Sequence, residues 1–167
     1  PANEIFAIFH AGGETLAKFL DDLLNTAPEQ LFAPQNHENV LTFVISLALN
    51  AKPMAIGRDV HYVLGRADLV LYKSNEESLL SDTVIEFKVA RQGENVLKKL
   101  AAGAKQIVDK RYGISYKTPD PVRYCIVFSN DLRQVGAIGA VKGDGSYEVT
   151  YLSSKLTESH VQQSQES

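Results

Sequence analysis

The sequence contains a single cysteine, Cys125, among its 167 residues. One thiol excludes an internal disulfide and any zinc site built from several cysteines. Cys125 lies in the apolar run Val122–Phe128, where a buried and unreactive thiol is the expected state. The four histidines have no metal-ligand spacing, so we interpret them as structural or solvated.

Long hydrophobic runs are absent as well. No run approaches the roughly 18 to 20 apolar residues that span a bilayer, and no basic-then-apolar leader precedes a small-residue cleavage site. The sequence therefore predicts no membrane partner and a cytoplasmic location for the segment as given. Because it begins at Pro1 rather than at a methionine, a longer parent protein could carry targeting information elsewhere.

The chain also lacks a basic excess, since its formal net charge is −3. This balance counts against a nucleic-acid partner. The charge is unevenly distributed, however: nine Lys and Arg face three acids between Lys88 and Arg123, a local +6 that leaves −9 for the rest. Phosphate contacts need only a local basic surface, and an ordinary solvated helix face is the alternative interpretation.

Two apolar segments carry charged residues that are unusual in strands. In an extended Val84–Val89 segment, Glu86 and Lys88 share one face, because successive side chains alternate. The run Ala67–Tyr72 also reads as a strand, and a hairpin between the two segments would place Asp68 beside Glu86. The sequence therefore predicts that two carboxylates and a lysine converge.

This cluster suits a hard divalent cation. Mg²⁺ (or Mn²⁺) favours oxygen ligands and keeps several waters, so Asp68, Glu86 and one backbone carbonyl form a sufficient protein contribution. A bound metal lowers the pKa of a water and stabilises charge on a phosphate, while Lys88 supports the nucleophile or the developing charge. Phosphodiester hydrolysis is the indicated reaction. A buried ion pair of Asp68 or Glu86 with Lys88 is the structural alternative.

These residues resemble the D…ExK signature of the PD-(D/E)XK nuclease superfamily, with Ala67 in place of the proline. The closer likeness, over roughly Asn36 to Phe128, is to the bacterial branch often found C-terminal to an AAA-ATPase-like domain. The matching pieces are His37-Glu38-Asn39, Gly65-Arg66-Ala67-Asp68, Ile85-Glu86-Phe87-Lys88 and Ala104-Lys105-Gln106-Ile107, with Lys110-Arg111-Tyr112-Gly113 closing the helix of the last piece. Four such pieces in the right order are more specific than D…ExK alone.

The resemblance implies a fold and a set of roles. The fold is an α/β restriction-endonuclease-like core (αβββαβ) with a central mixed sheet of four to five strands and flanking helices. The implied catalytic residues are Asp68, Glu86, Lys88, Glu38 and Gln106, and the implied metal ligands are Asp68, Glu86 and the Phe87 carbonyl. Substrate contacts are expected from Arg66, Arg91, Lys99 and Tyr112. A dipole-stabilising surface role for Glu38 and a solvated position for Gln106 are the alternatives.

The periodicity and the breakers predict the layout of the chain. We expect a helical segment packed on the core over 1–35, the nuclease-like domain over 36–152, and a disordered polar tail or linker over 153–167. Helices are expected over Glu14–Asn25, Asn36–Asn50 and Glu94–Tyr112, the last ended by Gly113. Asn3–His10 fits either a helical turn or a strand. Six apolar segments read as strands, with the Cys125 strand central: Ile56–Leu64, Ala67–Tyr72, Val84–Val89, Val122–Phe128, Val135–Val141 and Tyr147–Leu152.

Two classes of function remain open at this point. The favoured one is a magnesium-dependent endonuclease that cleaves DNA, with RNA cleavage a weaker variant because no stacking-aromatic platform is visible. The second is a catalytically inactive module of the same fold that binds a partner protein or nucleic acid, for example within a larger effector or toxin. Binding of a metal ion discriminates between them.

Overall fold

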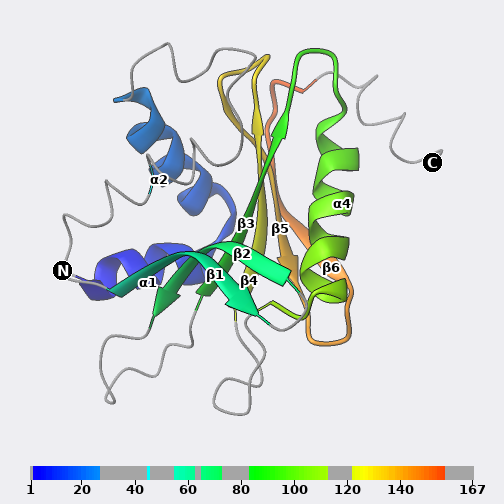
Figure 1. The fold of residues 1–167 in the computed structure, drawn as a ribbon. Helices are drawn as coiled ribbons and strands as arrows, with labels where there is room; N and C mark the ends of the chain where they lie inside the picture. Colours follow the sequence, from blue (N-terminus) through cyan, green and yellow to red (C-terminus); the bar gives the residue numbers. More distant parts are fainter. Residues whose placement is uncertain are drawn as a thin grey trace.

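The computed structural model describes residues 2–26, 45, 55–62, 65–72, 83–112 and 122–156; for 2–6, 55–62, 65–67 and 72 it describes the backbone alone. The described helices are α1 (Ala2–Ala11), α2 (Gly13–Asn25) and α4 (Val96–Asp109). The described strands are β1 (Ala55–Tyr62), β2 (Gly65–Tyr72), β3 (Thr83–Ala90), β4 (Val122–Ser129), β5 (Gln134–Val141) and β6 (Tyr147–Leu152). Figure 1 shows their arrangement.

The six strands form one mixed sheet in the order β1-β2-β3-β4-β5-β6. The first three strands pair antiparallel, and so do the last three. Between these two units, β3 and β4 run parallel, with α4 as the crossover between them (Figure 1). The parallel pair is therefore the centre of the sheet.

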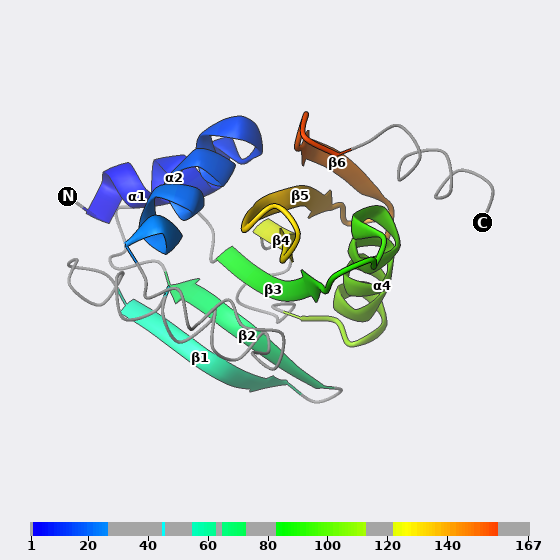
Figure 2. The same cartoon turned by 90° about the horizontal axis from the view of Figure 1, so that it is seen from above.

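Helices cover both faces of this sheet: α1 and α2 lie on one face and α4 on the other (Figure 2). Alternation along β3 sends Ile85 and Phe87 toward α1 and α2, where they join a buried apolar cluster. On the other face, Val84 and Ala90 pack with the buried residues of α4. The side chains of Glu86 and Lys88 belong to this second face.

The ends of α4 are fixed by local hydrogen bonds. Asn95 is its N-cap, and the Asn95 side chain accepts a hydrogen bond from the Lys98 N–H at 3.0 Å. Along the helix, Leu100, Ala104 and Ile107 are buried at helical spacing against the sheet. At the N-terminus of the chain, Phe9 packs edge-to-face on Phe19, with ring centroids 6.1 Å apart.

These elements confirm the α/β class and the mixed sheet expected from the sequence. The sheet has six strands where four to five were expected, because all six predicted segments join it. The ambiguous Asn3–His10 segment is helical, and the Cys125 strand is central as predicted. Of the helix expected over 36–50 only Ile45, which is helical and buried, is described; the 157–167 part of the predicted tail lies outside the described residues.

Within the described part of the chain, no helix combines the length and the apolar composition that crossing a membrane requires.

Candidate active site

Asp68 lies where the pairing between β2 and β3 ends. The two strands pair at Leu69 and Ile85, the last partners in this direction. Two residues beyond Ile85, the Phe87 N–H donates a hydrogen bond to the Asp68 carboxylate, with 2.8 Å between N and Oδ2. The side chain thus takes the place of a backbone acceptor, and this contact holds Asp68 beside Glu86, as the hairpin in the sequence predicted.

Glu86 and Lys88 stand next to each other on β3 beneath α4. The Lys88 ammonium lies 3.5 Å from Glu86 Oε1, and the exposed fractions of the two side chains are 22% and 4%. Glu86 Oε2 is buried and has no hydrogen-bond partner among the described residues. Burial and, secondarily, the charge of Asp68 raise the pKa of Glu86 to about 8, although Lys88 acts in the opposite direction.

Gln106 of α4 connects these groups. Its Oε1 accepts a hydrogen bond from Lys88 Nζ at 2.9 Å, and its Nε2 donates to Glu86 Oε1 at 2.7 Å. The same Nε2 donates to the Tyr112 hydroxyl at 3.0 Å. A reversed amide would direct its NH₂ group at the Lys88 ammonium, so the three contacts together specify one orientation. We call Asp68, Glu86, Lys88, Gln106 and Tyr112 the polar cluster.

Tyr112 reaches Gln106 because of the way α4 ends. The Tyr112 N–H donates to the Ile107 carbonyl and the Arg111 N–H to the Val108 carbonyl, each at 3.2 Å, which is a Schellman motif. Arg111 is the left-handed residue of this motif, with φ 53°. The position after the helix is therefore Arg111 rather than the expected Gly113. The turn buries Tyr112 to 2% exposure, which suits a contact with Gln106 rather than with substrate.

Close packing of α4 on the central strands keeps Gln106 within reach of β3. Gly103 lies directly over β4, and a β-carbon there would overlap the Cys125 sulfur and come within 3.1 Å of Lys88 Cγ. Only glycine allows this approach. Cys125 is buried beneath the polar cluster, and burial raises the pKa of its thiol, so the thiol stays protonated as expected.

Of the other predicted site residues, the structure describes the side chains of Arg91 and Lys99, and both lie outside this cluster. Glu38 is outside the described residues, and only the backbone of Arg66, opposite His61 in β1, is described. Arg91 is exposed just after the end of β3, where its N–H donates to Glu94. Lys99 forms an ion pair with Glu94, with 3.2 Å between Nζ and Oε2. Sequence reasoning gave no signal for Gly103, because its role depends on contact with a distant strand.

The donor set of the cluster fits a hard divalent cation. Two carboxylates lie side by side, and the unpartnered, buried Oε2 of Glu86 is an oxygen that a cation would satisfy. Among the described residues, no group of three or more His, Cys, Asp or Glu side chains converges. Asp68 and Glu86 would thus hold an ion together with backbone oxygen and water, a pattern typical of Mg²⁺.

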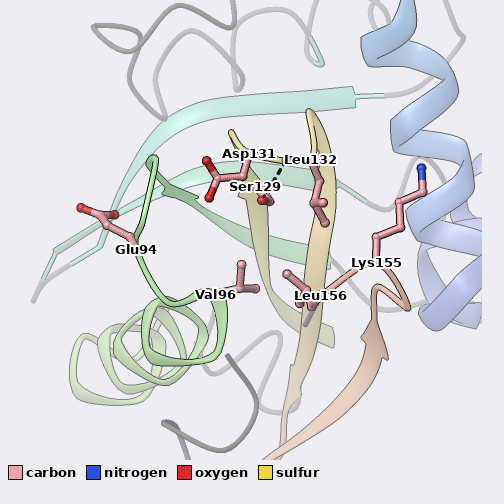
Figure 3. A pocket seen from close by; sticks show the side chains of 7 residues that line it. All are labelled: Glu94, Val96, Ser129, Asp131, Leu132, Lys155 and Leu156. Atoms are coloured by element: carbon pink, nitrogen blue, oxygen red, sulfur yellow. Dashed lines mark hydrogen bonds between the residues drawn. The ribbon is translucent and has the colours of Figure 1, made fainter. Parts of the chain in front are cut away.

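A separate pocket of about 130 Å³ lies at the other end of α4 (Figure 3). Its walls are the aliphatic side chains of Val96, Leu132 and Leu156, and the Ser129 hydroxyl inside it accepts a hydrogen bond from the Leu132 N–H. Val96 begins α4, ten residues before Gln106, so the pocket lies roughly 15 Å along the helix axis from the polar cluster. It is therefore no part of the cluster.

The mixed sheet with flanking helices and this cluster on one face define an α/β domain with a restriction-endonuclease-like fold. A family model described as the PD-(D/E)XK nuclease superfamily matches residues 36–137, which is more than half of the chain. The chain belongs to this superfamily, as the sequence motifs predicted. No curated protein and no solved structure gives a significant match.

Proposed function

We propose that the chain is a divalent-metal-dependent nuclease that hydrolyses phosphodiester bonds of DNA. The observation that carries this proposal is the convergence of Asp68, Glu86 and Lys88. Gln106 bonds to Glu86 at 2.7 Å and to Lys88 at 2.9 Å, and Asp68 accepts from the N–H of Phe87, the residue between them, at 2.8 Å. Superfamily membership gives the nuclease fold. Chemistry transfers only where the required residues are present, and here Asp, Glu and Lys are all present.

In this proposal, Asp68 and Glu86 hold Mg²⁺ or Mn²⁺ together with the Phe87 carbonyl. The N–H and C=O of a strand residue point to the same side. Because the Phe87 N–H contacts Asp68, the Phe87 carbonyl faces the side of β3 on which Asp68 lies, which supports its assignment as a ligand. A bound Mg²⁺ would supply a water of lowered pKa and stabilisation of the charge that develops on the phosphate.

Lys88 is the cation that the chain itself contributes. One of its three N–H donors is held by Gln106 Oε1, and Glu86 lies 3.5 Å away. This tether fixes the ammonium while a further donor can contact the nucleophile or a phosphate oxygen. Gln106 in turn is held by Tyr112. We assign Lys88 the role of supporting the nucleophile and the charge that develops on the phosphate. We assign Gln106 the role of positioning Lys88.

Residues outside the polar cluster complete the proposed site. Glu38 would act as an accessory carboxylate, and Arg66, Arg91 and Lys99 would contact the phosphate backbone. We propose 36–152 as the nuclease domain, preceded by a helical segment over 1–35 and followed by a tail over 153–167. The α2 contribution to the core supports this layout: Asp21 accepts a hydrogen bond from the Val135 N–H of β5 at 2.8 Å.

The alternative is an inactive module of this fold that binds a partner protein or nucleic acid, in a larger effector or toxin. The net charge of −3 favours this alternative. It predicts no need for a cation between Asp68 and Glu86, so metal binding separates the two functions.

The test is cleavage of supercoiled plasmid, single-stranded DNA and RNA with Mg²⁺, with Mn²⁺ or with EDTA. Wild type is compared with Asp68→Ala and Lys88→Ala. Matched controls are Asp22→Ala and Lys18→Ala, which change exposed residues of α2 that pair with each other away from the site. The proposal requires metal-dependent cutting that survives in both controls and is lost in both site variants. A folded wild type that cuts no substrate and binds no Mn²⁺ would leave the binding module as the better account.

A further inference from the structure

The end of α4 carries an unusual backbone conformation at a charged residue. Arg111 has φ 53°, a left-handed conformation that a residue with a β-carbon adopts at a free-energy cost. Glycine is the usual residue at this position of a Schellman motif. Strained residues of this kind concentrate at functional sites, where the side chain is retained despite the strain. The conformation alone does not assign a role, because Arg133 has φ 52°, so the surroundings of Arg111 decide.

The surroundings of Arg111 place it next to the polar cluster. Arg111 directly precedes Tyr112, whose hydroxyl is bonded to Gln106. Lys110 lies four residues after Gln106, and so it falls on the same side of the helix. Both Lys110 and Arg111 are exposed. Two adjacent cations thus stand at the end of α4 that carries Gln106.

Neither cation is neutralised within the described part of the chain. The side chains of Lys110 and Arg111 form no hydrogen bond or ion pair with any described residue, and the nearby Asp109 is paired with Lys105 instead. An exposed guanidinium is suited to bidentate contact with a phosphate. The simpler reading is that both cations only complement the negative end of the helix dipole.

We propose that Arg111, assisted by Lys110, binds the phosphate backbone of the nucleic acid beside the scissile bond. This inference rests on the proposed nuclease function and extends its substrate site to the C-terminal end of α4. The left-handed backbone turns the chain so that Tyr112 is buried against Gln106 while Arg111 stays in solvent next to it. The same turn thus orders the cluster and presents a phosphate-binding group.

The chain offers a matched control for the test. Arg133, in the turn between β4 and β5, is exposed and has φ 52°. Leu132 of this turn lines the pocket at the opposite end of α4 (Figure 3). Arg111→Gly and Arg133→Gly therefore remove the same charge and relieve the same backbone conformation at opposite ends of the helix. Arg111→Lys keeps the charge, and Arg111→Asn introduces a second neutral residue that tolerates this conformation.

The experiment measures binding of a fluorescein-labelled duplex DNA to the full chain in EDTA over a range of salt concentrations, together with thermal unfolding. For Arg111→Gly and Arg111→Asn, the slope of log K against log salt should become shallower by about 0.9, one phosphate contact. The melting temperature of Arg111→Gly should rise by about 2–4 °C, because glycine relieves the backbone. Arg111→Lys and Arg133→Gly should keep the wild-type slope.

Each outcome decides the inference. If Arg111→Gly keeps the wild-type slope while wild type still cleaves DNA, Arg111 does not bind phosphate, and the nuclease proposal stands without it. If wild type neither binds nor cleaves nucleic acid, the inference falls together with the proposed function. A raised melting temperature combined with a reduced slope for the Arg111 variants alone would establish the substrate contact.

Discussion

Replacing Glu86 with glutamine should stabilise the metal-free protein at neutral pH. The folded protein holds Glu86 with a pKa of about 8, whereas 4.5 is the value for the free side chain. At a pH between these two values, Glu86 has lost its proton in the unfolded chain but retains it in the folded protein. The free energy of unfolding therefore decreases as pH rises from about 4.5 to about 8. Outside that window the contribution of Glu86 does not change with pH. The amide that Glu86→Gln introduces does not titrate, so the variant lacks this pH dependence.

The magnitude follows from the width of this window. Each pKa unit corresponds to about 1.4 kcal/mol, so by pH 7 the wild type has lost about 3 kcal/mol relative to acid conditions. Glutamine keeps an oxygen that can accept from Gln106, but its NH₂ group lies where Oε2 had no partner. Imperfect bonding there costs about 1 kcal/mol. The expected net gain for Glu86→Gln at pH 7 is about 2 kcal/mol.

Urea unfolding of both proteins in EDTA, at several pH values from about 5 to about 8, measures this difference. The variant should be the more stable protein, and its advantage should grow with pH across this range. Asp144→Asn, which changes an exposed acid in the β5–β6 turn, is the control and should show no growing advantage. A difference between wild type and Glu86→Gln that is independent of pH would refute the raised pKa and with it the reasoning.

Three further predictions concern the same site. Binding of Mg²⁺ at pH 7 should release close to one proton, because Glu86 must ionise to act as a ligand; calorimetry in buffers of different ionisation enthalpy measures this, and zero release would contradict it. Gly103→Ala should lower the free energy of unfolding by about 1–3 kcal/mol, and adding Cys125→Ala to this variant should recover part of the loss. No recovery would show that the sulfur of Cys125 is not the cause of the loss. Tyr112→Phe should lower kcat about fivefold, as expected for a lost hydrogen bond of about 1 kcal/mol, with KM unchanged; a rise in KM alone would instead indicate a substrate contact.

The strand pair that carries the carboxylates could be predicted from the sequence because its signals are local. Alternation along Val84–Val89 places Glu86 and Lys88 on one face whatever the rest of the chain does. The polar loop between the two apolar segments indicates a hairpin, and a hairpin brings Asp68 to Glu86. The hydrogen bond from Phe87 to Asp68 could not be predicted, because it depends on the register at which the pairing of β2 and β3 ends.

The helical side of the site was less accessible to sequence reasoning. Gly113 is the obvious residue to follow the helix, yet the left-handed position is taken by Arg111, which directly precedes the buried Tyr112. The place of Gly103 over Cys125 joins residues of different elements through close packing. Neither feature has a periodic signal, since both arise from contacts between a helix and a distant strand.

The hydrogen bonds of the polar cluster link stability and cation binding at a single atom. A buried glutamate is tolerated when its oxygens have partners. Gln106 and Lys88 satisfy Oε1 of Glu86, and Oε2 is left without a partner among the described residues. Burial and the charge of Asp68 raise the pKa of this carboxyl, and the unpartnered Oε2 is a place for a cation. A substitution that removes the charge of this carboxyl, such as Glu86→Gln, should therefore stabilise the metal-free fold and abolish metal binding together, which separates a proposed ligand from a structural ion pair.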